Sequence, residues 1–375
     1  MRIGIDARFY GPIGKGLGRY TQKLIEGLEK IDHSNQYFIF LRKENINEYQ
    51  PKNANFTKIL ADYRWYTFSE QFLFLRVIKK QRLDLMHFPH FNVPILYTGK
   101  FIVTIHDLIL VHFPTIRNTT LHPVFYKFKY WAYKLTIKNA ILRSNRIIAV
   151  SRFTKRDLLA RYKRIPEEKI QVTYEASEDF CMLSPNKDHE ILARYGIIKP
   201  YLLYVGNAYP HKNLEKLVEA FQDIAKKRND TQLILVGGMD YFYKQLLDFT
   251  LKQKAERVIF PGFIPDYDLD VVFHNAQAYV FPSLYEGFGL PPLEAMSKGT
   301  PVVCSDHPCM KEVLGAAALY FDGRKKEEIS RAMEIILDDD NIRNKLIANG
   351  YVQAKKYSWK NMAKDTLVIY QSVKF

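Results

Sequence analysis

The sequence predicts an α/β protein with two domains, each built on a parallel sheet. Its 375 residues correspond to two domains of ordinary size, and 47% of them are apolar, which is enough for two packed cores. Short apolar runs rich in Ile, Val, Tyr and Phe alternate with longer segments of helical period, as in parallel sheets that helices cover on both faces. These observations exclude a disordered tail and a small disulfide-stapled module.

The apolar runs predict ten strands, five in each half of the chain. In the first half they lie at residues 2–7, 37–41, 101–105, 146–150 and 170–174. In the second half they lie at residues 201–205, 232–236, 258–260, 278–281 and 301–304. Each set alternates with helical segments, which predicts two Rossmann-like sheets.

A polar stretch without periodicity, residues 178–189, separates the two halves and contains a Ser-Pro-Asn sequence that favours a linker. We therefore expect a first domain over residues 1–182 and a second over residues 183–355. Residues 356–375 are expected to form a C-terminal helix that packs back on the first domain.

The formal charge of +15 is concentrated in the first half of the chain. Residues 1–185 hold 30 Lys or Arg against 16 Asp or Glu, a net charge of +14, whereas residues 186–375 hold 25 against 24, a net charge of +1. This asymmetry indicates that one half meets something negative and extended, which is nucleic acid, an anionic membrane surface or a polyanionic substrate.

The cysteines and the amino terminus indicate a cytoplasmic protein. Cys181, Cys304 and Cys309 cannot form a disulfide framework without leaving one over, and none has the spacing of a metal site. Asp6 stands where a signal peptide needs an apolar stretch, and the best apolar run, residues 101–113, is interrupted by histidines and an aspartate. We therefore expect no membrane-spanning segment.

Ligands of open α/β sheets bind at the carboxyl ends of strands, so the residues after each predicted strand are candidates for function. The glycine-rich loop 11–18 leads into a helix predicted to begin near Arg19, which favours an anion site, although such loops also serve as flexible connections. His106 and Asp107 end a buried strand, where a histidine is as often a hydrogen-bonded structural residue as a functional one.

Lys212 stands just before a helix predicted over residues 214–227. A lysine at a helix amino terminus opposes the helix dipole, so this placement costs energy unless an anion binds nearby. At about 4 Å and an effective dielectric constant near 20, one lysine–phosphate charge pair contributes about 4 kcal/mol before desolvation. Lys212 is therefore a candidate phosphate-binding residue.

The most specific segment is residues 281–296, Phe-Pro-Ser-Leu-Tyr-Glu-Gly-Phe-Gly-Leu-Pro-Pro-Leu-Glu-Ala-Met. It predicts a strand that ends in a loop with Glu286, followed by a helix that begins at the two prolines and carries Glu294 in its first turn. A first-turn acid commonly complements the helix dipole, but this does not explain Glu286. Two carboxylates eight positions apart suit a polyhydroxylated ligand, because they accept hydrogen bonds from adjacent hydroxyls.

With this segment the chain resembles the retaining glycosyltransferases of family 4, whose GT-B fold has two Rossmann-like α/β domains facing a central cleft. Glu286 and Glu294 meet the family signature Glu-x7-Glu. The resemblance extends over nearly the whole chain, from the glycine loop near Gly16 to the closing Tyr-Ser-Trp at residues 357–359. In detail the chain is similar to bacterial mannosyltransferase-like enzymes of polysaccharide and O-antigen synthesis.

The resemblance implies a role for each site residue. Catalytic roles would fall to Glu286 on the transferred sugar, to Lys212 on the diphosphate, and to His106, which would contact the donor sugar from the first domain. Glu294 would bind the ribose of the nucleotide. The other implied donor contacts include Asn207, with Phe263 and Ile264 near the base. Backbone amides complete them, around Gly16, Gly287, Phe288, Gly289 and Leu290.

One departure from the family pattern concerns the second cation on the diphosphate. Many members have arginine directly after the glycine at position 206, where this chain has Asn207. The group that supplies the second positive charge is therefore open, with Arg19 and His211 as candidates.

The family mechanism has no assigned protein nucleophile, and retention is described as front-face attack in which the leaving phosphate takes the acceptor proton. Stabilising charge on the departing diphosphate is then the main requirement. The resemblance implies no metal and no cofactor, only a nucleotide-sugar co-substrate. We expect GDP-mannose, and UDP-sugars stay open. Asp268 and Asp270 resemble the metal motif of the other large glycosyltransferase fold, but we interpret them as ordinary acids at a helix start.

The basic excess is densest between residues 127 and 164, with 12 Lys or Arg and a single acid. On a helix, one face would hold Lys127, Trp131, Lys134 and Lys138, beside an apolar face of Phe125, Phe128, Ala132 and Leu135. A solvated helix explains this pattern, but so does contact with an anionic membrane, at about 1 kcal/mol per Lys or Arg. We expect a peripheral protein on the inner face of the cytoplasmic membrane, which supplies a lipid-linked or glycan acceptor.

Two alternatives stay open on the sequence alone. A GT-B-like epimerase or sugar phosphate synthase would share the fold, and the complete Glu-x7-Glu context disfavours it. A basic nucleic-acid-binding protein would explain the charge, but no recognition helix, zinc motif or RNP-type motif accompanies it, so we expect no nucleic-acid partner.

Overall fold

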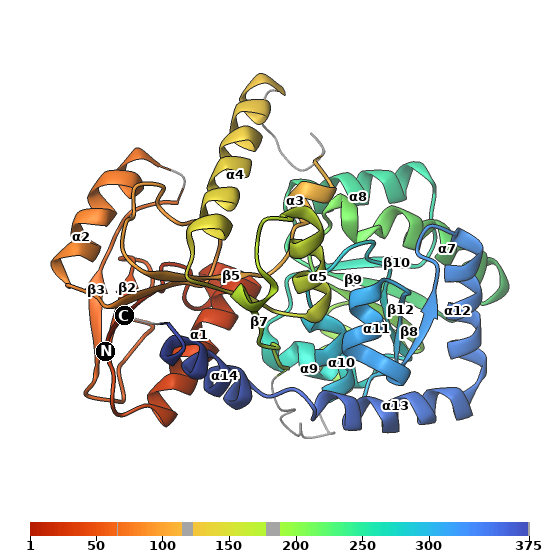
Figure 1. Ribbon diagram of the computed structural model, residues 1–375. Coiled ribbons are helices and arrows are strands. Elements are labelled where there is room, and N and C mark those ends of the chain that lie inside the picture. The colour runs from red at the N-terminus through yellow and green to blue at the C-terminus, as the bar shows by residue number, and fades with distance from the viewer. Residues whose placement is uncertain (66, 115–122, 178–187, 374–375) are drawn as a thin grey trace. The chain divides into compact units, whose positions relative to one another are not determined.

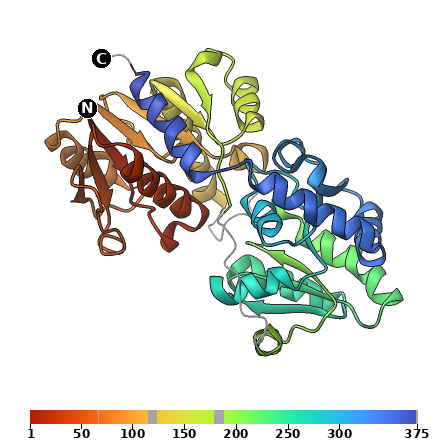
Figure 2. The same cartoon turned by 90° about the horizontal axis from the view of Figure 1, so that it is seen from below.

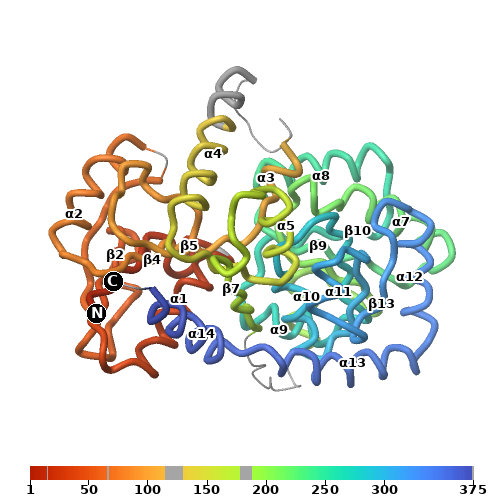
Figure 3. Tube along the Cα trace, viewed as in Figure 1, coloured from red at the N-terminus to blue at the C-terminus, as the bar shows by residue number. Residues whose placement is uncertain are grey.

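The computed structural model describes residues 1–65, 67–114, 123–177 and 188–373. The chain divides into two compact units, one of Met1–Glu175 with Ser358–Phe375 and the other of Ala176–Tyr357. Figure 3 traces the chain from the first unit through the second and back. The expected boundary between residues 182 and 183 lies outside the described residues. Both units have the predicted α/β architecture.

The first unit is built on a seven-stranded parallel sheet with the strand order β3-β2-β1-β4-β5-β6-β7. Its strands are β1 (Arg2–Asp6), β2 (Gln36–Leu41), β3 (Phe56–Leu60), β4 (Leu85–Phe88), β5 (Phe101–Ile105), β6 (Arg146–Ala149) and β7 (Ile170–Val172). The sequence did not predict β3 and β4. Strand β3 is a half-exposed edge with polar residues, and β4 has four residues that include the buried His87, so neither forms a long apolar run.

Helices cover both faces of this sheet (Figure 1). They are η1 (Pro12–Gly14), α1 (Lys15–Ile31), the π-helical turn η2 (Glu70–Phe74), α2 (Leu75–Lys80), α3 (Ile109–His112), α4 (Pro123–Arg143), α5 (Arg152–Arg161), η4 (Glu167–Lys169) and α14 (Trp359–Gln371). One hydrophobic cluster packs α1 and α14 against one face, and another packs α2, α4 and α5 against the opposite face.

The last helix, α14, belongs to the first unit although it follows the second in sequence. It lies along α1 (Figure 2), where a Cβ built on Gly27 would come within 2.5 Å of the Cβ of Ala363. The hydroxyl of Tyr370 is 2.7 Å from Nδ1 of His87 in β4. Close helix packing and a buried hydrogen bond therefore attach α14 to the first sheet.

The second unit has a six-stranded parallel sheet with the order β10-β9-β8-β11-β12-β13. Its strands are β8 (Tyr201–Val205), β9 (Gln232–Val236), β10 (Val258–Gly262), β11 (Ala278–Phe281), β12 (Val302–Ser305) and β13 (Ala318–Phe321). The sequence missed only the edge strand β13, whose two central residues are half-buried. The two middle strands, β8 and β11, lie side by side and carry the candidate site at their carboxyl ends.

The connecting elements of this unit are mostly helices. They are α6 (Asp188–Arg194), η6 (Pro210–Lys212), α7 (Leu214–Lys227), α8 (Tyr241–Lys252), α9 (Asp266–His274), α10 (Leu290–Ser297), α11 (Pro308–Leu314), η7 (Gly315–Ala317), α12 (Lys326–Asp338) and α13 (Asp340–Ala354). Across the described part of both units, no helix is long and apolar enough to cross a membrane.

Candidate active site

The strand ends of the second unit bring Lys212 and Glu286 into direct contact. The Nζ of Lys212 lies 2.5 Å from Oε1 of Glu286, and the two residues are only 9% and 7% exposed. They are 74 positions apart in sequence and meet because β8 and β11 are neighbours in the sheet. A buried charge requires a partner, so Glu286 supplies the anion that the placement of Lys212 demands.

The surroundings set the charge of the pair. Burial alone would raise the pKa of Glu286, but the charge of Lys212 and its hydrogen bond lower it. Burial, and then repulsion by Lys212, lowers the pKa of His211 to about 4. At neutral pH Glu286 is therefore ionised and His211 is uncharged, so His211 offers a polar ring rather than the second positive charge on a diphosphate.

Backbone contacts fix the loops that carry the pair. The amide of Leu284 donates to the carbonyl oxygen of His211 at 2.8 Å, and the hydroxyl of Ser283 donates to the same oxygen at 3.3 Å. Asn213 has a left-handed φ of 61°, and its side-chain amide donates to carbonyl oxygens after β11 and β13 at 3.3 and 2.7 Å. The Lys212 and Glu286 side chains are thus held by two loops that are bonded to each other.

The helix after Glu286 begins earlier than predicted. Helix α10 starts at Leu290, before the prolines, so the expectation that Glu294 lies in its first turn is wrong. Gly289 has φ 93°, and a Cβ there would lie 2.4 Å from the Cε of Met310, so this turn requires glycine. The turn starts the helix at Leu290 and places the half-buried Glu294 one turn inside it.

The loop between Glu286 and α10 offers backbone rather than side chains. Phe288 is 3% exposed and packs edge-on against Tyr357, with ring centroids 5.5 Å apart. Gly287 and Gly289 carry no side chain, and Leu290 is half-buried. The amides of this segment are therefore the groups that can face an anion at the start of α10.

The remaining donor residues of the second unit differ in accessibility. The carbonyl of Asn207 accepts a hydrogen bond from the hydroxyl of Tyr204 at 2.7 Å, and its Oδ1 accepts one from the amide of Tyr209 at 3.4 Å. Phe263 is 74% exposed, whereas Ile264 is 1% exposed. Of the two residues implied near the base, Phe263 is exposed to solvent, whereas Ile264 packs in the core.

The Asp268 and Asp270 side chains form ion pairs at the start of α9. Asp268 pairs with Arg194 at 3.0 Å and accepts a hydrogen bond from the hydroxyl of Tyr195 at 2.6 Å. Asp270 pairs with Lys298 at 2.5 Å. Within the described ranges, no three His, Cys, Asp or Glu side chains are grouped so that they could hold a metal ion.

In the first unit, His106 joins three strand ends. Its Nδ1 lies 2.9 Å from Oε1 of Glu175 after β7, and its Nε2 lies 2.9 Å from the carbonyl oxygen of Pro89 after β4. Both partners accept hydrogen bonds, so both ring nitrogens carry protons. Burial would lower the pKa of His106, but the hydrogen bond and charge of Glu175 raise it. The ring is an imidazolium, and Glu175, which the sequence reasoning missed, is its counter-ion.

The glycine loop of the first unit forms the start of α1. The helix begins at Lys15, four residues before the expected start near Arg19, so Gly16 and the half-buried Arg19 lie in its first two turns. A Cβ on Gly14 or Gly18 would come within 2.0 Å of a backbone oxygen, so both glycines serve close packing. A Cβ on Gly16 would meet no described atom within 4 Å. Gly16 therefore borders the open space that a ligand needs.

Helix α4 presents a basic face with apolar residues. Trp131, Lys134, Leu135 and Lys138 are exposed, whereas the opposite stripe is buried. Leu135 of the expected apolar face is 40% exposed, and the buried stripe of the helix consists of Tyr133, Thr136, Ile137, Ala140 and Ile141. The side chains of Lys127, Phe125 and Phe128 lie outside the described part of the chain.

Two protein-family profiles match this chain, one in each half. Residues 14–176 match the profile described as Glycosyltransferase Family 4, and residues 190–353 match the profile described as Glycosyl transferases group 1. The chain belongs to the family 4 glycosyltransferases. The two matches fall on the two units in turn, and Lys212, Glu286 and Glu294 lie in the second.

Relatives of this glycosyltransferase align over nearly the whole chain. It is 29% identical to O-antigen chain mannosyltransferase B of Escherichia coli over 95% of this chain and 96% of that protein. It is 27% identical to O-antigen chain mannosyltransferase RfbU of Salmonella typhimurium over 94% of each.

Solved structures share the fold at low sequence identity. WaaG, a glycosyltransferase involved in lipopolysaccharide biosynthesis, has a TM-score of 0.75 at 15% identity, covering 99% of this chain and 100% of that one. HepE of Anabaena in complex with UDP-glucose has a TM-score of 0.75 at 15% identity, with the same coverage. The GT-B fold expected for this glycosyltransferase, with two Rossmann-like units, is confirmed.

Sequence reasoning missed one group of side chains in this glycosyltransferase. Phe9, Trp65 and His90 follow β1, β3 and β4, and their rings are in contact. Trp65 and His90 went unnoticed because they follow the two strands that the sequence did not predict. A lone tryptophan and a histidine after unrecognised strands carry no signal of their own.

Proposed function

We propose that this enzyme transfers a mannosyl residue, with retention of configuration and without a metal ion, from GDP-mannose to a lipid-linked or polysaccharide acceptor. The observation that carries the proposal is the buried Lys212–Glu286 pair at the strand ends of the second unit. The relatives that align over 94–95% of the chain, which are mannosyltransferases of O-antigen chains by name, support the choice of sugar and acceptor.

The pair provides for both parts of the donor. A diphosphate offers Lys212 several anionic oxygens and attracts it more strongly than one carboxylate does. When Lys212 turns to the diphosphate, Glu286 is released to accept hydrogen bonds from sugar hydroxyls. Donor binding thereby converts an internal ion pair into two ligand contacts, so that Lys212 faces the diphosphate and the Glu286 carboxylate keeps hydrogen-bond donors.

The departing nucleoside diphosphate is stabilised by the same elements. Lys212 neutralises charge on its oxygens, and the amides of Gly287–Leu290 at the start of α10 point their partial positive charge toward an anion. Glu294, one turn inside α10, is assigned to the ribose. Because these groups are fixed before the reaction, little reorganisation opposes the charge that develops on the leaving group.

Glu286 is poorly suited to act as a general acid. In the ion pair with Lys212 the pKa of Glu286 is lowered, so the carboxylate meets the donor in its ionised form, without a proton to give to the leaving phosphate. This favours front-face attack, in which the leaving phosphate itself takes the proton of the acceptor hydroxyl. His106 remains assigned to the donor sugar, and reaching it would require the ring to exchange its bond with the Pro89 carbonyl for one with a sugar hydroxyl.

Binding measured by thermal stability tests the donor assignment. A nucleotide that binds the folded state raises its melting temperature, so GDP and GDP-mannose should stabilise the protein more than UDP, ADP or their sugars. Transfer of mannose to an α-mannose-terminated acceptor should follow, without epimerised or phosphorylated free sugar as product. Absence of stabilisation by any nucleoside diphosphate would overturn the proposal.

We also propose that the exposed face of α4 docks on an anionic membrane from the cytoplasmic side. Trp131 is 57% exposed and Leu135 is 40% exposed beside Lys134 and Lys138, which is the combination of apolar and basic residues that an interfacial helix needs. Each lysine near the surface contributes about 1 kcal/mol. The basic half of the chain is thereby assigned to the membrane rather than to nucleic acid.

Vesicle sedimentation tests this docking. Wild-type protein should sediment with anionic vesicles at low salt and be released at high salt, and the Lys134→Glu/Lys138→Glu variant should lose most of that binding. Lys244→Glu/Lys252→Glu on α8 is the matched control, because it removes two exposed lysines of the second unit. Equal binding to neutral and anionic vesicles, independent of salt, would contradict docking of α4 on an anionic membrane.

A further inference from the structure

Aromatic side chains form a continuous row at the strand ends of the first unit. The rings of Phe9 and Trp65 stack with centroids 4.0 Å apart and planes 13° apart, and the ring of His90 lies 5.4 Å from that of Phe9. Phe91 continues the row at 3.9 Å from His90, and Tyr133 of α4 follows at 5.0 Å. We call these five side chains the aromatic row. It extends from the loop after β3 to helix α4.

The aromatic row is not ordinary core. Phe9, Trp65, His90 and Phe91 are half-buried, and only Tyr133 is buried. Two polar atoms of the row, Nε1 of Trp65 and Nδ1 of His90, are buried without a hydrogen-bond partner in the described part of the chain. A buried polar atom without a partner costs about 1–3 kcal/mol, so these two atoms mark a place where a partner is missing.

A buried arginine holds the loops that carry the row. Arg8, which directly precedes Phe9, is 0% exposed. Its guanidinium contacts carboxylate oxygens of Asp6 and Glu70 at 2.7 Å and the carbonyl oxygen of Tyr63 at 3.1 Å. Glu70 in turn accepts a hydrogen bond from the side-chain amide of Asn92 at 2.6 Å. The loops after β1, β3 and β4 are therefore bonded to one centre.

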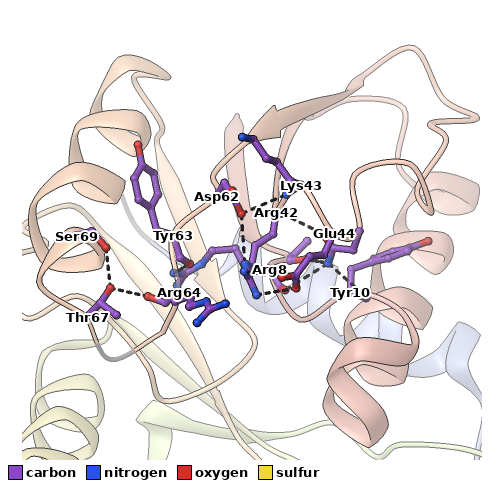
Figure 4. A network of polar contacts seen from close by, with 12 residues as sticks. Arg8, Tyr10, Arg42, Lys43, Glu44, Asp62, Tyr63, Arg64, Thr67 and Ser69 are labelled. Carbon is purple, nitrogen blue, oxygen red and sulfur yellow. Dashed lines mark hydrogen bonds and ion pairs between the residues drawn. The ribbon is translucent and has the colours of Figure 1, made fainter.

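The loop of Trp65 is closed by further polar contacts (Figure 4). Arg42, at the end of β2, lies between Glu44 at 2.9 Å and Asp62 at 3.6 Å, and its guanidinium is 5.1 Å from the centre of the Trp65 ring. The hydroxyl of Thr67 donates to the carbonyl oxygen of Arg64 at 2.8 Å. Trp65 is thus positioned before any ligand arrives, which reduces the entropy lost on binding.

The chemistry of the row is uncharged. Burial lowers the pKa of His90 to about 3, so its ring is neutral and has one nitrogen that donates and one that accepts a hydrogen bond. Aromatic faces are partially negative and attract the partially positive C–H groups on the apolar face of a pyranose ring. The indole N–H and the imidazole Nδ1 can serve hydroxyls at the rim of the same sugar. A neutral polyhydroxylated ring therefore fits, and a phosphate does not.

We infer that the aromatic row binds a neutral hexose of the acceptor glycan. The inference rests on the proposed function, because it assigns to the acceptor the part of the first unit that lies beside Gly16. The carbonyl of Phe9 packs against Gly14 at the start of α1, where Gly16 borders open space. At its other end the row reaches Tyr133 on α4, the helix whose exposed face is assigned to the membrane.

Calorimetric titration with mannotetraose tests the inference directly. Wild-type protein should bind this probe, and Trp65→Ala should weaken binding about tenfold, since an aromatic contact with its hydrogen bond is worth about 1.4 kcal/mol. Trp65→Phe keeps a ring but lacks the N–H, so it should lose less. Phe68→Ala is the control, because Phe68 is 86% exposed three residues away and lies outside the row. GDP should bind all four proteins equally.

The outcomes separate this inference from the proposed function. Equal mannotetraose affinity in the wild type and both Trp65 variants, or no binding to the wild type, would overturn the inference while GDP binding leaves the donor assignment intact. Competition between GDP and mannotetraose would make the row a nucleotide site and overturn it as well. If Trp65→Ala fails to fold, the mannotetraose titration is carried out on Trp65→Phe and on a His90→Ala variant instead.

Discussion

The two units meet their ligands with different chemistry. In the second unit the site is a buried ion pair, Lys212 with Glu286, at the ends of neighbouring strands. In the first unit the corresponding strand ends carry neutral rings and two buried polar atoms without partners. In the second unit, an anionic ligand can replace Glu286 as the partner of Lys212. In the first unit, the neutral rings suit an uncharged sugar. The fold repeats, but the side chains at the strand ends assign each unit a different ligand.

The same contrast separates net charge from site charge. The first half of the chain has a net charge of +14, yet its aromatic row is neutral and its buried Arg8 is matched by Asp6 and Glu70. The second half has a net charge of +1, yet its site depends on one placed lysine. Net charge therefore reflects the exposed surface, such as the exposed face of α4, and does not indicate which charges lie inside a binding site.

Removing the charged centre of the first unit should have the largest effect. In Arg8→Met, Asp6 and Glu70 remain buried without their counter-ion, so the free energy of unfolding should fall by about 3–5 kcal/mol. Urea denaturation measures this. Arg64→Met, which replaces an exposed arginine of the neighbouring loop, should change stability by less than about 0.5 kcal/mol. A loss below about 1 kcal/mol in Arg8→Met would show that Arg8 is not the centre of these loops.

Neutralising the carboxylate of the second unit should lower the rate as well as the stability, because Lys212 then loses its counter-ion. Glu286→Gln keeps the size of the side chain but removes the carboxylate charge that accepts hydrogen bonds from the sugar hydroxyls. We therefore expect kcat to fall by about 10²-fold or more. Initial-rate kinetics with saturating donor measure this. Glu256→Gln, on an exposed loop of the same unit, should leave kcat unchanged. Near-wild-type turnover of Glu286→Gln would refute the role of Glu286.

Removing the lysine of the pair should weaken nucleotide binding and shift the pH dependence. In Lys212→Met the Kd for GDP should rise about 10- to 100-fold, because a charge-assisted contact worth about 1.5–3 kcal/mol is lost. Glu286 has a lowered pKa in the folded protein, so its ionised form stabilises the fold above that pKa and the contribution is lost as pH falls through it. Without Lys212, burial raises the pKa of Glu286, so the variant should lose stability as pH rises through that pKa rather than as pH falls.

The control for this variant is Lys298→Met, which breaks the ion pair with Asp270 elsewhere in the same unit. It should alter stability without changing the affinity for GDP or the acid limb of the pH profile. Calorimetry and pH-dependent melting distinguish the two variants. An unchanged acid limb in Lys212→Met would contradict the assigned source of the Glu286 pKa.

The smallest effect is expected at His106. In Glu175→Gln the charged partner that contributes most to raising the pKa of His106 is removed while the burial of the ring remains, so the imidazolium should lose its proton at lower pH than in the wild type. A histidine whose pKa is raised in the folded protein stabilises the fold at pH values below its pKa in the unfolded chain. This contribution is lost as pH rises through its pKa in the folded protein. The variant should therefore lose stability mainly at acidic pH. NMR titration of the imidazole checks this, and an unchanged pKa in the variant would contradict the pairing.

Much of this account could be predicted from the sequence, because it depends on local patterns. The ten predicted strands all exist, since buried parallel strands are apolar runs that any chain reveals. The Glu-x7-Glu segment indicated the family, and the two family profiles confirm it. The start of α10 was misplaced because a left-handed turn at Gly289 begins the helix before its prolines, and a φ angle is not visible in a sequence.

The remaining features depend on distant contacts. That Lys212 pairs with Glu286 follows from the order of β8 and β11 in the sheet, which periodicity does not give. Glu175 became visible as the partner of His106 only in the fold. Trp65 and His90 were missed with their strands, because a half-exposed edge strand and a four-residue strand containing a histidine lack the apolar run that identifies the others.

One crossed binding measurement tests the division of ligands between the units most directly. Calorimetry of GDP and of mannotetraose is carried out on the wild type, Lys212→Met and Trp65→Ala. The account predicts that Lys212→Met loses affinity for GDP and keeps that for mannotetraose, while Trp65→Ala loses affinity for mannotetraose and keeps that for GDP. If either variant loses both ligands to the same extent while remaining folded, or if neither loses the ligand assigned to it, the two sites are not divided in this way.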